Sequence, residues 1–123
     1  WPMVVVGAGH LGRALVHYGG FIDRGFRVIA VFDNDAAVVG TDLNQLTVMD
    51  ISQMSDVIRA NSVRIAMLAV PADHAQAVCD VLVASGVRAI LSYAPITLIA
   101  PSHVNIQYID PVTHLQKMTY YID

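Results

Sequence analysis

A glycine-rich segment near the start of the chain most constrains how it can fold. Gly7, Gly9 and Gly12 lie in the run Gly-Ala-Gly-His-Leu-Gly, directly after an apolar run at residues 3–6. A segment with helical spacing of apolar side chains follows it. Asp33 ends the next apolar run, 21 residues after Gly12. A strand, this glycine pattern, a helix and an acid at about that interval are typical of a dinucleotide-binding βαβ unit.

The rest of the chain alternates apolar runs with helical patterns, which favours a parallel sheet covered by helices on both faces. We expect an α/β fold, a Rossmann-type doubly wound and mainly parallel sheet. Its strands are predicted at residues 3–6, 27–33, 46–50, 63–70, 87–92 and 104–109, and its helices at 10–24, 52–61, 73–85 and 112–122.

Each glycine of the motif has a distinct predicted role. Gly7 permits the tight turn, Gly9 lets the backbone approach a pyrophosphate, and Gly12 lets the helix pack close to the strands. Asp33 is expected to accept hydrogen bonds from the adenosine ribose and to repel a 2′-phosphate, which favours NAD over NADP. Asp35 is a second candidate for that role, although an Asp here also suits a turn.

Further ligand contacts are expected at the carboxyl ends of the later strands, where ligands bind in this architecture. The predicted cofactor-binding residues are Gly7, Ala8, Gly9, His10, Leu11, Gly12, Asp33, Asn34, Val70, Pro71, Tyr93, Ala94 and Pro95. We expect residues 69–72 to lie near the ribose and Ala94-Pro95 near the nicotinamide.

Composition excludes several other classes of protein. The net charge is −3 and no cluster of Lys or Arg occurs, so this chain by itself is not expected to bind nucleic acid. No segment reads as a membrane span, because the longest uncharged stretch, residues 89–109, contains two prolines and several polar residues. The single cysteine, Cys79, fits a reducing compartment and hence the cytoplasm.

Nothing in the chain suggests catalysis or metal binding. The five histidines show no metal-ligand spacing, and we find no place in the sequence that would hold a substrate. We therefore predict no catalytic residue and no enzyme activity. The chain begins Trp-Pro rather than with Met, and we expect it to be a fragment that lacks a preceding domain.

The details of the sequence resemble one family, the redox-sensing transcriptional repressor Rex, in its C-terminal NAD(H)-binding domain. The resemblance runs along nearly the whole chain in the family's order, and its most specific parts are an Ala-Pro loop and a Leu-Gln-x-x-Thr-Tyr-Tyr tail. The residues that carry it are 5–15, 18–21, 25–27, 32–35, 39–40, 70–72, 75–76, 86–95, 109–110 and 115–121.

This resemblance implies a homodimer that binds NADH and NAD⁺ and controls operator DNA through an N-terminal winged-helix domain absent from this chain. It implies a Rossmann domain at residues 1–111 and a helix at 112–123 that is exchanged between protomers. Tyr18 matches a tyrosine that bonds across the dimer to an aspartate, which Asp110 matches. Pro111 departs from the Leu or Phe usual at the next position, and His10 from the commoner residues of the loop.

Two alternatives stay open at this point. The chain could be the cofactor domain of an NAD-dependent oxidoreductase whose catalytic part lies outside it. It could also be a CoA-binding domain, which shares the fold and would bind CoA while ignoring NADH.

Overall fold

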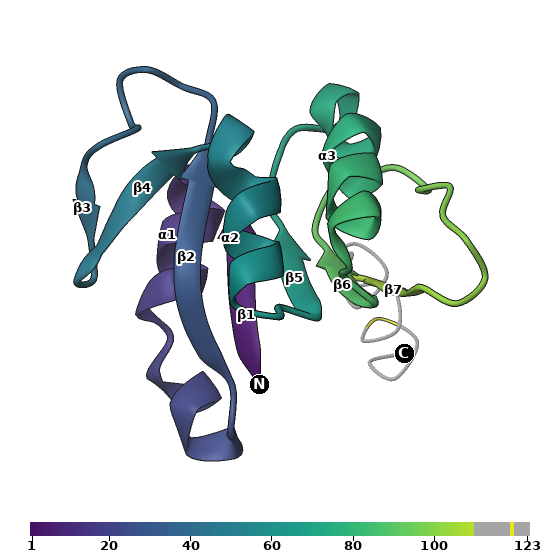
Figure 1. Ribbon diagram of the computed structural model, residues 1–123, viewed down its shortest axis with the longest axis horizontal. Coiled ribbons are helices and arrows are strands. Elements are labelled where there is room, and N and C mark those ends of the chain that lie inside the picture. Colours follow the sequence, from purple (N-terminus) through teal and green to yellow (C-terminus); the bar gives the residue numbers. More distant parts are fainter. Residues whose placement is uncertain (110–118, 120–123) are drawn as a thin grey trace.

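The computed structural model describes residues 1–109 and 119. Within them a seven-stranded sheet has the order β3-β4-β2-β1-β5-β6-β7 (Figure 1). Every neighbouring pair is parallel except β3 and β4. The strands are β1 Pro2–Val6, β2 Arg27–Asp33, β3 Asp42–Leu43, β4 Leu46–Asp50, β5 Ile65–Leu68, β6 Ala89–Ser92 and β7 Asn105–Tyr108. The predicted α/β fold with a mainly parallel sheet is confirmed.

Helices cover both faces of this sheet (Figure 1). Among residues 1–109 the α-helices are α1 His10–His17, α2 Met54–Ala60 and α3 Ala72–Ser85, and the short 3₁₀ helices are η1 Gly19–Arg24 and η2 Ile51–Gln53. The central strand β1 shows why two layers form, because its side chains alternate between faces. Val4 and Val6 join a core with residues of α2 and α3, whereas Met3 and Val5 join a second core with residues of α1.

The carboxyl ends of the central strands meet at one edge of the sheet, and backbone bonds tie the following residues to neighbouring strands. Gly7 N donates to Phe32 O at 2.7 Å, and Ala69 N donates to Val6 O at 2.8 Å. Tyr93 N donates to Leu68 O at 2.9 Å. The segments that follow β1, β5 and β6 therefore lie side by side at the edge where this architecture binds ligands.

The prediction of one helix over residues 10–24 is wrong for its second half. Helix α1 ends at His17, because Tyr18 adopts an extended conformation with φ −70° and ψ 108°. The chain then continues as the 3₁₀ helix η1 to Gly25, whose left-handed φ of 85° closes it. The paired glycines after Tyr18 explain the break, because glycine is a poor residue for a helix interior.

Strand β3 was not predicted. It pairs with β4 through a two-residue turn in which Asn44 has φ 51° and Gln45 has φ 69°. Positive φ at both central residues is the type I′ hairpin geometry. The Asn44 side chain also donates to Val16 O at 3.1 Å, which ties this hairpin to the last turn of α1.

The other predicted elements are found with small shifts at their ends. Helix α2 begins at Met54 after the short η2, rather than at Ser52, and α3 ends at Ser85 before Gly86, as predicted. The predicted helix at residues 112–122 lies outside the described residues. No helix in the described part of the chain is long and apolar enough to span a membrane.

Candidate functional site

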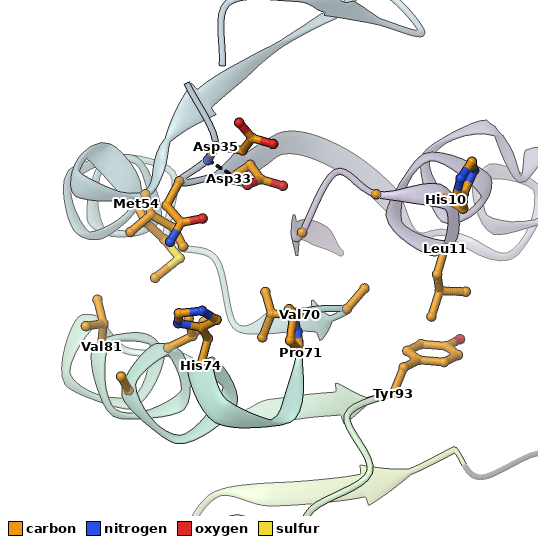
Figure 2. A pocket seen from close by; sticks show the side chains of 17 residues that line it. His10, Leu11, Asp33, Asp35, Met54, Val70, Pro71, His74, Val81 and Tyr93 are labelled. Carbon is orange, nitrogen blue, oxygen red and sulfur yellow. Dashed lines mark hydrogen bonds between the residues drawn. The ribbon is translucent and has the colours of Figure 1, made fainter. Parts of the chain in front are cut away.

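A cavity of about 720 Å³ opens at the carboxyl edge of the sheet (Figure 2). The glycine loop lies on one side of it, the end of β2 on another, and the start of α3 on a third. Nine of the predicted cofactor-binding residues line this cavity: Gly7, Gly9, His10, Leu11, Asp33, Asn34, Val70, Pro71 and Tyr93. Residues 61 positions apart in sequence, such as Gly9 and Val70, therefore line the same cavity.

The geometry of the glycine loop supports the separate roles predicted for its three glycines. Gly7 has φ +107°, and a Cβ there would lie 2.3 Å from Ala69 O. A Cβ on Gly12 would lie 1.7 Å from Gly7 O, so α1 packs directly against the turn. At Gly9 a Cβ would meet no heavy atom within 4 Å, which leaves open space at the N-terminus of α1. Backbone N–H groups there favour an anion.

Asp33 holds this loop as well as facing the cavity. Its carboxylate accepts a hydrogen bond from Ala8 N at 2.7 Å and another from Asp35 N at 2.9 Å. Each carboxylate oxygen can accept more than one hydrogen bond, so Asp33 retains capacity for a ligand hydroxyl. The Asp35 carboxylate accepts a hydrogen bond from Ala37 N at 2.9 Å, as an Asp in a turn does, and Asp35 also lines the cavity.

Four predicted residues do not line this cavity. Ala8 is buried and acts through its N–H bond to Asp33, and Gly12 is buried beneath the turn. Ala94 and Pro95 line a second cavity of about 410 Å³, together with Ile96, Thr97, Tyr108 and Ile109. Tyr93 belongs to both cavities and forms the boundary between them. Whether these four residues contact a ligand stays a prediction.

The sequence did not predict the end of the large cavity that is lined by α2 and α3. There the lining comes from η2, α2 and α3, in the residues Ile51, Met54, His74, Ala77, Val78 and Val81. In Figure 2, His74 and Val81 lie across the cavity from Asp33 and Asp35, whereas Met54 lies close to the two acids. In the sequence these positions are ordinary members of amphipathic helices, and only the packing of α2 beside α3 brings them to the cavity.

The far end of the cavity, near Leu11, Val70 and Tyr93, is largely apolar (Figure 2). Burial raises the pKa of the Tyr93 hydroxyl above its ordinary value, so this group stays neutral and able to donate a hydrogen bond. A cationic ring would lose hydration there, and none of the described residues named at this end of the cavity carries a negative charge. Within residues 1–109 and 119, no three His, Cys, Asp or Glu side chains gather as a metal site requires.

Tyr18 lies away from this cavity, half exposed at 52%. Its ring meets Phe21 edge to face, with 4.7 Å between ring centroids, and its hydroxyl accepts a long 3.4 Å hydrogen bond from Arg24. A Cβ on Gly20 would lie 2.5 Å from the Tyr18 ring, so glycine there leaves room for this ring position. Asp110 and Pro111, the other two residues assigned to the dimer contact, lie outside the described residues.

Residues 1–96 match the family described as the CoA binding domain. The chain belongs to this family. Its curated relatives include the redox-sensing transcriptional repressor Rex of Chloroflexus aurantiacus, 47% identical over 99% of this chain and 58% of the relative. Another is the Rex of Roseiflexus sp., 48% identical over 99% of this chain and 56% of the relative. The chain thus spans less than two thirds of the relatives it matches.

A solved structure is also similar to this chain and belongs to a Rex-family protein. The crystal structure of RSP, a Rex-family repressor, is 31% identical, with a TM-score of 0.94 over 99% of this chain and 58% of that one. RSP has also been crystallised in complex with β-NADH, and with β-NAD⁺ and operator DNA. The predicted resemblance to Rex is confirmed. These relatives are named as repressors, not enzymes, as we predicted.

Proposed function

We propose that this chain is the NAD(H)-binding sensor domain of a Rex-type redox-sensing repressor, and that it reads the NADH/NAD⁺ ratio without catalysing a reaction. The observation that carries the proposal is the single cavity that joins the glycine loop, Asp33 and the apolar surface beside Tyr93. These three parts suit a pyrophosphate, a ribose and a nicotinamide in turn. The RSP complexes with NADH and NAD⁺ support the same ligands here.

The sensing step is a difference in affinity between two forms of one ligand. NADH and NAD⁺ differ by a hydride and by a positive charge on the nicotinamide ring. A ligand shifts a two-state protein only by its difference in affinity between the states. The apolar wall formed by Leu11, Val70 and Tyr93 favours the neutral ring, and Ala94-Pro95 behind Tyr93 would extend that wall.

We further propose that the chain acts as a homodimer and that a winged-helix domain outside it contacts operator DNA. The chain's net charge of −3 supports DNA binding through another part of the protein. Tyr18 supports the dimer, because it is a half-exposed aromatic residue four positions before the exposed Ile22, and exposed apolar side chains are suited to a protein contact. The domain boundary at residue 111, the exchanged helix at 112–123 and the contact between Tyr18 and Asp110 belong to this proposal.

The family's description raises CoA as the competing ligand. The site favours NAD(H) over it for an electrostatic reason. The adenosine ribose of CoA carries a 3′-phosphate, whereas the ribose of NADH has two free hydroxyls. Asp33 and Asp35 both face the region where that ribose would lie (Figure 2). Two carboxylates repel a phosphate dianion and accept hydrogen bonds from hydroxyls.

Calorimetric titration of the chain with NADH, NAD⁺ and CoA under identical conditions tests the proposal. We expect NADH to bind more tightly than NAD⁺, with no turnover and no heat of CoA binding. Equal affinity for NADH and NAD⁺ would contradict the sensor function and favour a general cofactor domain. Binding of CoA without binding of NADH would replace the proposed ligand altogether.

A further inference from the structure

The loop at residues 93–104 is held at one residue by a side-chain clamp from α3. Gln76 Nε2 donates to Ile99 O at 2.8 Å, and Ile99 N donates to Gln76 Oε1 at 2.9 Å. One side-chain amide therefore satisfies both main-chain groups of Ile99, as a neighbouring strand would. The same Nε2 also donates to Asp80 Oδ1 at 2.8 Å, which fixes the orientation of the amide.

A second clamp comes from β7, where the side chain of Tyr108 bonds to the backbone of Leu98, the residue before Ile99. Its hydroxyl accepts from Leu98 N at 2.9 Å and lies 3.4 Å from Leu98 O, to which it donates. The Leu98 side chain is buried in the core, whereas the Ile99 side chain is 81% exposed. Packing of its side chain therefore restrains Ile99 little, and the bonds to Gln76 hold its backbone.

This clamped loop reaches the candidate site at its first residue. It starts at Tyr93, which lines both cavities, and continues through Ala94 and Pro95. Gln76 belongs to the same helix that lines the large cavity with His74 and Ala77. Helix α3 therefore lines the end of the cavity near Asp33, where the adenosine is expected. Through Gln76, the same helix also fixes the loop that begins at Tyr93.

We propose that Gln76 is a positioning residue for the nicotinamide half of the nucleotide, acting through the loop at residues 93–104. The inference rests on the function proposed above. Gln76 does not line the cavity, so it acts by holding the backbone of Ile99 and with it the surface presented by Tyr93 and Pro95. The adenosine half of the ligand would meet the end of β2 and other residues of α3 rather than the loop at residues 93–104, so its binding does not depend on this clamp.

The Gln76→Leu variant tests this, because leucine has a similar size and makes neither hydrogen bond. The ligands are NADH, NAD⁺ and ADP-ribose, which has no nicotinamide. From the loss of the paired bonds we expect NADH affinity to fall about tenfold and the preference for NADH to narrow. ADP-ribose affinity should stay within about twofold. Gln107→Leu is the matched control, since the Gln107 side chain bonds only to Asn105 among the described residues.

Tyr108→Phe provides a second variant that leaves α3 unaltered and should give the same pattern. Amide hydrogen exchange at Ile99 without ligand should rise in Gln76→Leu and not in the Gln107 control. An equal loss of affinity for all three ligands, or unchanged NADH affinity in both variants, would overturn the positioning role. Failure of the wild-type chain to prefer NADH would instead refute the proposed function, and this inference with it.

Discussion

Substituting alanine for Gly9 or for Gly12 tests the roles assigned to the glycine loop. The change at Gly9 should weaken nucleotide binding, whereas the change at Gly12 should destabilise the fold. Gly9 has φ −74° and ψ −164°, which any residue can adopt, and a Cβ there meets no heavy atom within 4 Å. Alanine at position 9 raises the free energy of unfolding by about 0.4–1 kcal/mol, because it restricts the unfolded chain. It lowers the same free energy by a similar amount, because alanine is a poor N-cap residue. The free energy of unfolding of Gly9→Ala should therefore change by less than about 1 kcal/mol.

Binding should respond very differently to Gly9→Ala. The new methyl group occupies the space above the N-terminus of α1, where the pyrophosphate is expected. A hydrogen bond to a charged group contributes about 1.5–3 kcal/mol, and each 1.4 kcal/mol is a factor of ten in affinity. Loss of one such bond therefore weakens NADH about 10- to 100-fold.

Gly12→Ala should instead lower the free energy of unfolding, because its Cβ would lie 1.7 Å from Gly7 O and the backbone must move. Overpacking of this kind costs about 1–3 kcal/mol or more of stability. Urea unfolding of the ligand-free proteins and calorimetric titration with NADH separate the two effects. Gly19→Ala is the control, since a Cβ there also meets no atom within 4 Å and Gly19 lies outside the cavity. Wild-type NADH affinity in a folded Gly9→Ala protein would refute the placement of the pyrophosphate.

Three further predictions follow from other residues. Asp33→Ala should weaken NADH and NAD⁺ alike by about tenfold or more through loss of a charged acceptor, and unchanged affinity in calorimetry would exclude its ribose role. Burial and then the Asp80 charge raise the pKa of Cys79, so a thiol reagent should modify it at neutral pH only after denaturation. Because the folded-state pKa values of Cys79 and Tyr93 are raised, their contribution to stability is full below the unfolded-state values. It is lost as the pH rises through the folded-state values; alkaline urea titrations should show this decline, and Cys79→Ala should reduce it.

Much of the fold could be predicted because local pattern and tertiary structure agree. Strand β2 has the predicted bounds, and α3 ends at Ser85, directly before Gly86, whose φ of +114° suits glycine. The errors occurred where a local signal was weak. The Asn44-Gln45 turn lacks the glycine that usually marks a type I′ hairpin, and the helical pattern beyond His17 hid the change to a 3₁₀ helix.

The candidate site divides in the same way. Residues of the glycine loop and Asp33 could be predicted, because each carries a requirement that few residue types satisfy. Met54, His74 and Val81 could not, since they reach the cavity only through the way α2 and α3 pack against each other. Gln76 was noted only as part of a resemblance, and its pairing with Ile99 connects residues 23 apart that no local pattern relates.

The double hydrogen bonding of Asp33 has a consequence for attempts to redesign cofactor preference. Replacing the acid at the end of the second strand is the natural first step toward accepting a 2′-phosphate. In this chain the same carboxylate also holds Ala8 N at 2.7 Å and Asp35 N at 2.9 Å. Removing this carboxylate would release the glycine loop as well as remove the proposed acceptor for the ribose. A replacement intended to admit a 2′-phosphate must therefore keep a hydrogen-bond acceptor for Ala8 N, as asparagine does and alanine does not.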